Sequence, residues 1–433
     1  MSAIELGDVT AGPAQAPEPP IVSRALVRTV LAAVAVLALA LTSASGRPQP
    51  SRMVRPMWSV AITDLSQYAL NDDALFVLNN GLDLTAYELA DGRVRWSKRL
   101  TEPQTVRTAE DLASLLLPSG YKRITKNDAQ GLSTLESVPA ATLSLNPATG
   151  IERWRFPGTI GHRDTVTALL VEADPRGGLP KTFRRIRIAD GAVLWEHAAG
   201  HPDYWIADAG HLVTLGADGR AEVYGMSDGV RVSDGRPLPG RKDDSTGVEV
   251  DATALYLKHN EGGRLTVAAF DLATLRPRWT VDAGDTAREA HLCGAILCVG
   301  HGAATSGYDL STGQPRWQAP GWINAAIVTG GRLLAERAEG AGEGLLDAAT
   351  GTLQRDLGSG YPVWDTAAGT PSFLLRDTTK PPGRTAVFRI DERSGRRQLR
   401  GSIDGLPGKT CLAARNHLIC LTTNGRLTVV EVA

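Results

Sequence analysis

The sequence has almost no excess charge and few cysteines. Its 433 residues include 46 lysines and arginines against 47 aspartates and glutamates, for a formal charge of −1. No global field is available to hold a polyanion, so nucleic-acid binding is not expected. Four cysteines exclude a disulfide-dense scaffold but leave room for a few bridges. With 42% apolar residues and 46 glycines, the composition indicates a folded chain rich in turns.

Motifs for metal or phosphate chemistry are also missing. The eight histidines form no H-x-H, H-E-x-x-H or Cys/His cluster in the sequence. The glycine-rich stretch 300–307 (GHGAATSG) lacks the Lys-Ser/Thr pair of a phosphate-binding loop. We therefore predict no metal ligands, no cofactor-binding residues and no catalytic residues.

The N-terminal part of the chain carries a membrane-insertion signal. Residues 1–24 contain four prolines among small and acidic residues, a composition that predicts a disordered tail. Residues 25–46 include the uncharged run TVLAAVAVLALALTSA, whose 16 residues lie between the lengths of a signal-peptide core and a full span. A signal anchor is favoured over a cleaved signal peptide because a long polar segment precedes the run. Residues 47–53 are the expected linker.

Charge does not orient this segment in the membrane. Arg24 and Arg28 precede the apolar run, while Arg47, Arg52 and Arg55 follow it, so the positive-inside rule gives no decision. A cytosolic scaffold anchored in the opposite orientation stays open from charge alone.

One pattern recurs along the rest of the chain: an apolar strand, a residue such as Asp four places before a Gly, and a Trp four places after it. The best copies are YELADGRVRW (87–96), LNPATGIERW (145–154), FDLATLRPRW (270–279) and YDLSTGQPRW (308–317). A further copy keeps Gly191 and Trp195 but has Arg187 at the Asp place, and copies without Trp occupy 225–233, 346–355 and 390–399. This self-similarity predicts a repeat architecture.

The chemistry of the repeat is structural. Asp and Asn accept backbone N–H bonds a few residues on, and Gly supplies the positive φ that closes a turn between strands. We therefore expect the recurring carboxyl and amide side chains to form turns rather than a catalytic centre: Asn146, Asp271, Asp309, Asp347 and Asp391. The Trp of each unit is expected to pack between neighbouring sheets with its N–H bonded.

Repeat spacing and the two chain ends predict a closed β-propeller over residues 54–433. The turn glycines, with Leu275 in one slot, recur every roughly 40 to 60 residues, which fits four short strands per unit. RLTVVEVA (426–433) matches RLTVAAFD (264–271) and stops before the Trp strand, while VRPMWSV (54–60) supplies an orphan Trp58 strand. The N-terminal strand is thus predicted to complete the last blade and leave no open edge.

These residues resemble the PQQ-like β-propeller repeat family, which includes quinoprotein dehydrogenases and the propeller lipoprotein of the outer-membrane barrel assembly machinery. The resemblance covers about residues 54–433 and implies an all-β, eight-bladed propeller, with seven to nine blades as the range. Counting every unit gives nine blades, so eight requires one unit between residues 101 and 200 to be incomplete or an insertion.

Two functions follow from this resemblance. The first is a non-enzymatic, membrane-tethered, extracytoplasmic module that binds a protein or cell-envelope ligand at a propeller face, secreted if residues 25–46 are cleaved. The alternative is a quinoprotein-like oxidoreductase using PQQ and calcium. Family members of that kind use an Asp base and often a disulfide of adjacent cysteines, and no two cysteines are adjacent here. We favour the binding module and predict no cofactor.

Three tryptophans outside the repeat register are the candidate contacts. Trp205, Trp322 and Trp364 each follow a blade boundary, where the innermost strand of the next blade enters near the axis. Their rings suit recognition of a flat ligand or a partner side chain. Packing between inner strands is the competing interpretation.

The cysteines fall into two hairpins. A two-residue turn at Arg415-Asn416 places Cys411 directly opposite Cys420, and Cys293 with Cys298 is offset but close. We predict two disulfides, with free buried thiols in a cytosolic propeller as the alternative.

Overall fold

The structure is a computed structural model. It describes residues 53–63, 66–102, 105, 114–127, 133–175, 178–233, 235–238, 246–328, 330–340, 342–365, 370–391, 394–406 and 411–433. All of them belong to one compact unit, Arg52–Ala433. The predicted tail 1–24, the apolar segment 25–46 and residues 47–52 of the predicted linker lie outside the described residues. Within the described ranges, no helix has the length and apolar character needed to cross a membrane.

The unit is all-β, and seven of its sheets consist of consecutive antiparallel strands alone. They are β2–β5 (Gln67–Leu70, Ala74–Asn79, Asp83–Glu88, Val94–Arg99), β6–β8 (Leu115–Asn127, Ser133–Leu145, Glu152–Pro157), β9–β12 (Thr159–Arg163, Thr167–Ala173, Pro180–Arg187, Val193–Ala198), β13–β16 (Tyr204–Asp208, His211–Leu215, Arg220–Gly225, Arg236–Pro237), β17–β20 (Thr246–Val250, Ala254–Glu261, Arg264–Asp271, Pro277–Gly284), β21–β24 (Ala287–Cys293, Ile296–His301, Ala304–Asp309, Pro315–Pro320) and β25–β28 (Trp322–Val328, Arg332–Arg337, Glu343–Asp347, Leu353–Gly358).

An eighth sheet combines two groups of strands. One is β29–β32 (Tyr361–Asp365, Thr370–Thr379, Pro382–Ile390, Arg397–Asp404), and the other is β33–β35 (Cys411–Ala414, His417–Leu421, Arg426–Val432) with β1 (Val54–Ala61). Among the described residues, β29 and β33 pair through Asp365 and Ala413, in parallel.

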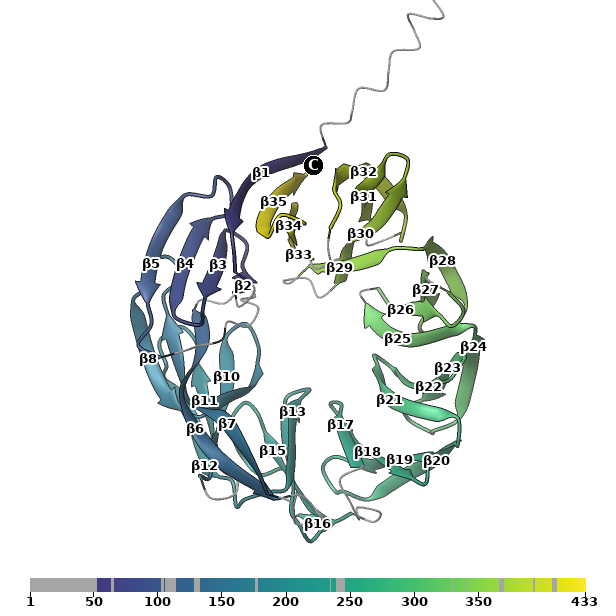
Figure 1. The fold of residues 1–433 in the computed structure, drawn as a ribbon. Helices are drawn as coiled ribbons and strands as arrows, with labels where there is room; N and C mark the ends of the chain where they lie inside the picture. The colour runs from purple at the N-terminus through teal and green to yellow at the C-terminus, as the bar shows by residue number, and fades with distance from the viewer. Residues whose placement is uncertain are drawn as a thin grey trace, which may run out of the picture. The chain divides into compact units, whose positions relative to one another are not determined.

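Successive sheets lie side by side in chain order, with β2, β13, β17, β21, β25 and β29 on the inner side (Figure 1). This arrangement is that of a β-propeller. The predicted count of eight blades is not confirmed. The described residues form nine strand groups, because β6–β8, with three strands in those residues, forms a sheet of its own between β2–β5 and β9–β12.

The predicted closure by the N-terminal strand is confirmed. β1 pairs antiparallel with β35, with Val54 opposite Val432 and Trp58 opposite Val429. The guanidinium of Arg426 donates to the Ser59 hydroxyl and carbonyl, each at 2.8 Å. The first and last strands of the unit therefore share one sheet, so the order of sheets has no open end.

Tryptophan and glycine form a repeated contact between neighbouring sheets. Each repeat Trp donates its indole N–H, over 2.8–3.0 Å, to the carbonyl three residues before the turn glycine of the next sheet. A Cβ added at that glycine would lie only 2.5–2.9 Å from a ring atom. The pairs are Trp58–Gly92, Trp96–Gly150, Trp154–Gly191, Trp195–Gly229, Trp279–Gly313 and Trp317–Gly351. Glycine is needed for ring contact as well as for its positive φ.

Leu275 occupies the one turn position of this series where glycine is replaced. It has a φ of 53°, unusual for a branched residue. The preceding sheet has Ser233 where the repeat Trp belongs, and Leu275 is buried in an apolar cluster with Val213 and Val223 of that sheet. A leucine side chain thus supplies apolar packing at the interface that lacks a tryptophan.

The predicted turn-forming side chains accept backbone N–H groups as expected. Asn146 accepts from Ala148, and Asp271 accepts from Thr274 at 2.9 Å. The carboxylates of Asp309, Asp347 and Asp391 do the same within their own turns. A hydrogen bond from Arg278 is the main reason that the pKa of Asp271 falls to about 2. These carboxylates are structural.

Candidate functional site

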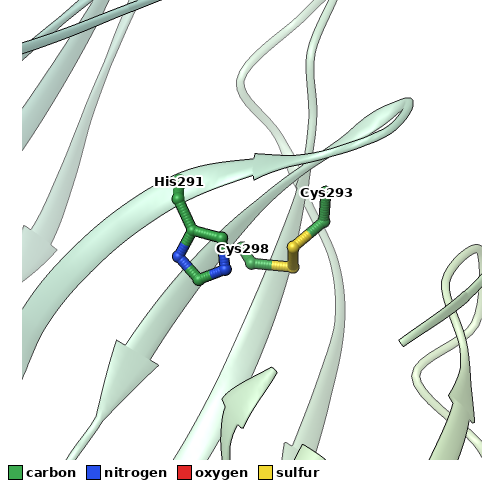
Figure 2. Close-up of side chains that lie close together, drawn as sticks. All are labelled: His291, Cys293 and Cys298. Atoms are coloured by element: carbon green, nitrogen blue, oxygen red, sulfur yellow. A yellow bond between two sulfur atoms is a disulfide. The ribbon is translucent and has the colours of Figure 1, made fainter. Parts of the chain in front are cut away.

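The hairpin of β21 and β22 gathers a histidine and two cysteines on one face. Cys298 pairs directly opposite His291 across the hairpin, and Cys293 lies two residues beyond His291 on the same strand. Residues two apart on a strand share a face. The three side chains therefore lie together on the same side of the hairpin (Figure 2), with their potential ligand atoms within 4.8 Å of one another.

Both predicted disulfides are present. Cys293 and Cys298 are bridged with their Cα atoms 5.8 Å apart. Cys411 and Cys420 are bridged with their Cα atoms 4.3 Å apart, and they pair directly opposite each other as the turn at Arg415-Asn416 predicted. Cys293, Cys298 and Cys420 are fully buried. The first bridge lies in an apolar cluster between two sheets, and the second lies in a cluster between the two strand groups of the eighth sheet.

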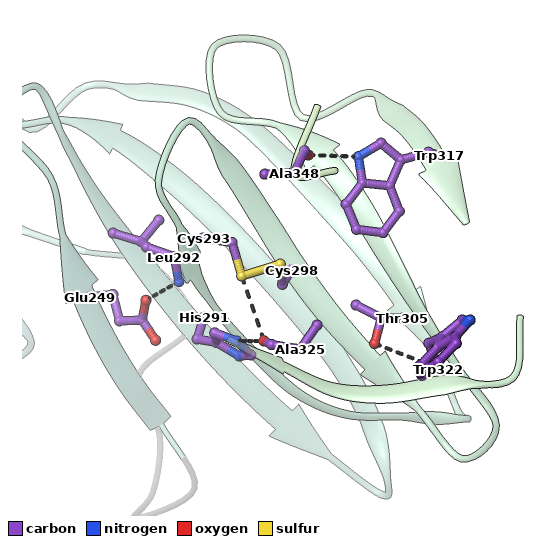
Figure 3. Close-up of a disulfide and its surroundings, with 10 residues drawn as sticks. All are labelled: Glu249, His291, Leu292, Cys293, Cys298, Thr305, Trp317, Trp322, Ala325 and Ala348. Atoms are coloured by element: carbon purple, nitrogen blue, oxygen red, sulfur yellow. Dashed lines mark hydrogen bonds between the residues drawn. A yellow bond between two sulfur atoms is a disulfide. The ribbon is translucent and has the colours of Figure 1, made fainter. Parts of the chain in front are cut away.

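The Ala325 carbonyl of β25 connects the first bridge to the next sheet. His291 Nε2 lies 2.6 Å from the Ala325 oxygen, and Cys293 Sγ lies 3.8 Å from the same atom (Figure 3). On the other side, the backbone N–H of Leu292 donates to Glu249 over 2.6 Å. Inner strands of three consecutive sheets are thus joined around this hairpin.

The histidine and cysteine cluster was not predicted from the sequence. No Cys/His cluster stands at motif spacing along the chain, because His291 approaches Cys298 only through the hairpin register. The sequence does carry a signal for this cluster. It is H-x-C on one predicted strand, followed by a two-residue turn and a second Cys three places after that turn. In the observed oxidised state the sulfurs are bonded to each other, so they offer no thiolate to a metal.

Trp322 and Trp205 have the environment of packing residues. The Trp322 ring is 8% exposed, with the Arg337 guanidinium 4.9 Å from its centroid. Trp205 packs edge-on against Phe183 at 5.6 Å, and a Cβ at Gly161 would come within 2.3 Å of its ring. These placements match the packing alternative. A binding role for either residue stays a prediction.

Trp364 is exposed on the inner strand β29. Its residue is 37% exposed, and Tyr361 on the same strand and Ile327 on β25 are also exposed. We call these three residues the β25–β29 apolar set. The two strands are the first strands of consecutive sheets, which share a buried cluster containing Val328 and Leu374. The structure therefore separates Trp364 from Trp205 and Trp322 by its exposure.

Both strands of this set depart from regular pairing beside the exposed residues. The register shifts between Val363 and Trp364 on β29. On β25 it shifts between Ile323 and Ala326, where Asn324 has a φ of 50°. Bulges of this kind re-aim side chains and are common next to binding sites.

Two glutamates face each other next to β25. Glu336 and Glu343 are directly paired on β26 and β27, and Asn324 donates to Glu336 over 3.0 Å. Burial, together with repulsion from Glu336, raises the pKa of Glu343 to about 7. The Glu343 carboxyl is therefore partly protonated near neutral pH.

This proton gives an expected pH dependence of stability. Because the pKa of Glu343 is higher in the folded state, its stabilisation is complete below the unfolded-state pKa and disappears as pH rises through about 7. Between roughly pH 5 and pH 8 the unfolding free energy is expected to fall as Glu343 ionises. In Glu343→Gln this fall should be smaller by about 1–3 kcal/mol. Denaturant unfolding at several pH values measures this loss. Glu339→Gln, at an exposed position, is the control variant. If Glu343→Gln lost as much unfolding free energy over this pH range as the parent does, the assignment of the pH dependence to Glu343 would be contradicted.

The fold is similar to those of solved propeller structures. BamB from Moraxella catarrhalis has 16% sequence identity and a TM-score of 0.38, covering 87% of this chain and 97% of its own. The computationally designed Ika8 protein has 13% identity and a TM-score of 0.42, covering 80% and 99%. The C-terminal WD40 domain of Sif2 has 9% identity and a TM-score of 0.38, covering 88% and 99%.

No protein-family model and no curated protein sequence matches the chain. The chain has a structural match to BamB at low sequence identity. At these identities the similarities concern the fold, and no ligand, partner or activity is carried over from them. The chain is an all-β protein of β-propeller type that is similar to BamB.

Proposed function

We propose that this protein is a non-enzymatic binding module, tethered to a membrane through residues 25–46, that holds a protein partner at the inner side of its propeller. The observation that carries the proposal is the exposure of Trp364 and Tyr361 on β29, beside a break in strand register. A folded chain gains nothing in stability from an aromatic ring left in water, whereas such rings dominate the energy of many interfaces.

Covalent bracing on both sides of the apolar set supports this role. The β21–β22 hairpin carries one disulfide, and its turn residue Gly294 approaches Ile327, with 3.5 Å from an added Cβ to the Ile327 side chain. The β33–β34 hairpin carries the other, and Asp365 of β29 accepts the Arg415 N–H of that hairpin over 2.8 Å. Held rigidly, the exposed rings lose little conformational entropy when a partner binds.

The disulfides also support the predicted compartment. Bridges of this kind persist in oxidising environments and are rare in the reducing cytosol. We therefore propose that the propeller lies outside the cytoplasm, which agrees with an N-terminal insertion signal.

Photo-crosslinking in the native host tests the proposal. A benzophenone amino acid at position Trp364 is expected to give a discrete crosslinked band in the membrane fraction. The same probe at position Leu353, 45% exposed on the last strand β28, is the control and should give none. Equal crosslinking from both positions, or a band confined to the cytosolic fraction, would contradict the binding site or the tether.

A pair of substitutions separates binding from packing. Trp364→Ala is expected to remove the crosslink made from position Tyr361 while changing the melting temperature little, because its ring is already exposed. Trp322→Ala should lower the melting temperature, since truncating a buried Trp costs about 3–5 kcal/mol. Stoichiometric binding of PQQ with Ca²⁺ to the purified chain would favour the oxidoreductase alternative instead.

A further inference from the structure

We propose that reduction of the Cys293–Cys298 disulfide opens a metal site for Zn²⁺, with His291, Cys293 and Cys298 as ligands. The proposal concerns a second, reduced state of this hairpin and does not rest on partner binding at Trp364. It rests on the geometry of three side chains, on their surroundings and on the chemistry of their donor atoms.

The hairpin geometry brings the donors within reach of one ion. The potential ligand atoms of the three residues already lie within 4.8 Å of one another. In a tetrahedral zinc site with Zn–S near 2.3 Å, two sulfur ligands lie roughly 3.8 Å apart. Breaking the S–S bond and rotating the Cys293 and Cys298 side chains is enough to reach that separation, with no change of strand register.

The donor set suits zinc better than a hard cation. Two thiolates and an imidazole are the ligands that zinc selects, whereas calcium and magnesium prefer oxygen. The Ala325 carbonyl oxygen, 2.6 Å from His291 Nε2, is the nearest further donor (Figure 3). It either completes the coordination or accepts a hydrogen bond that orients the imidazole.

The surroundings favour a neutral complex. The two cysteines are fully buried in a cluster with Ala319, Trp322 and Leu333. Burying separate thiolates in such a cluster is costly, but two thiolates cancel the charge of one Zn²⁺ ion. His291 is only partly buried, so the imidazole marks the side from which an ion can enter.

The chemistry balances with a dithiol as the reductant. Two successive thiol–disulfide exchanges transfer two electrons to the Cys293–Cys298 bond, giving two thiols while the dithiol becomes a disulfide. Zn²⁺ then replaces the two thiol protons, which are released to solvent. Exchange with a second disulfide reverses the sequence: it takes two electrons from the two thiolates, becomes a dithiol and releases the ion.

Cobalt substitution tests the site in the full chain. The Cys411→Ser/Cys420→Ser variant, which keeps only the bridge in question, is reduced with a dithiol, freed of reductant under anaerobic conditions and titrated with Co²⁺. We expect one Co²⁺ per chain, with thiolate-to-cobalt charge-transfer absorption and tetrahedral ligand-field bands, and competition by Zn²⁺. The unreduced protein is expected to show neither band.

Two further variants keep the test decisive. The reduced wild-type chain should bind as the first variant does, whereas Cys293→Ser/Cys298→Ser, which retains the other pair, should lack the charge-transfer band. His291→Ala should weaken Co²⁺ binding at least about tenfold while keeping the melting temperature of the reduced protein. Absence of the band in reduced wild type, its presence in Cys293→Ser/Cys298→Ser, or unchanged affinity in His291→Ala would each overturn the proposal.

Discussion

Removal of residues 54–61 is expected to destabilise the propeller by more than any single core substitution. The deletion removes the strand that pairs with β35 and exposes the β35 edge from Arg426 to Val432. It also removes Trp58, whose indole donates to the Leu89 carbonyl of the first complete sheet over 2.9 Å. Losing that ring alone is worth about 3–5 kcal/mol. We expect aggregation or a large fall in melting temperature, measured by light scattering and circular dichroism.

A peptide added in trans provides the control for this deletion. VRPMWSVA should restore the melting temperature and suppress aggregation by occupying the vacant edge, as in strand complementation. A scrambled peptide of the same composition should not. A deletion variant that remains monomeric and melts with the parent would show that the β1–β35 pairing does not hold the propeller closed.

Trp154→Ala is expected to cost about 3–5 kcal/mol of unfolding free energy, the range for truncating a buried Trp. The ring is 7% exposed, and its N–H donates to the Ile188 carbonyl over 2.9 Å. Trp154→Phe keeps an aromatic ring but loses that hydrogen bond, so it should cost less. Urea unfolding monitored by circular dichroism compares the variants.

The facing glycine gives a sharper result. In Gly191→Ala the new Cβ would lie 2.7 Å from Trp154 Cγ, at a residue whose φ is +75°. When Trp154 is also alanine the two ring contacts disappear, leaving a 3.0 Å contact with the Cβ at position 154 and the left-handed backbone penalty of about 1–2 kcal/mol. The double variant should therefore be less destabilised than the sum of the singles. If the destabilisations of the two single variants simply added in the double variant, the position of the Trp154 ring would not depend on glycine at position 191.

The repeat made most of the fold predictable. The Asp, Gly and Trp positions predicted the turns and the contacts between sheets, and the matching chain ends predicted the β1–β35 pairing. The blade count was harder, because β6 and β7 are paired strands of 13 residues each that carry neither the repeat turn nor its Trp. The turn glycine and the Trp of this repeat appear only at Gly150 and Trp154, so the sequence did not show how many strands precede them.

The candidate sites were less predictable because they depend on which way a side chain faces. Trp322 and Trp364 occupy similar places after a blade boundary, yet one is 8% exposed and the other 37%. The register shift next to Trp364 has no marker in the sequence. His291 was likewise passed over, since its nearness to Cys298 is a property of pairing across a turn.

The Leu275 interface indicates how the repeats have diverged. All six repeat tryptophans face a glycine in the next repeat, and leucine replaces glycine where Ser233 has replaced the tryptophan. Ser233 and Leu275 lie in different repeats, so an alignment of whole repeats places these two neighbouring substitutions in separate rows. Aligning the Trp place of each repeat with the turn of the following repeat places both substitutions in the same row. At the other interface that lacks a tryptophan, Arg355 stands in the Trp place and Gly395 is kept, so the compensating change is particular to the Leu275 interface.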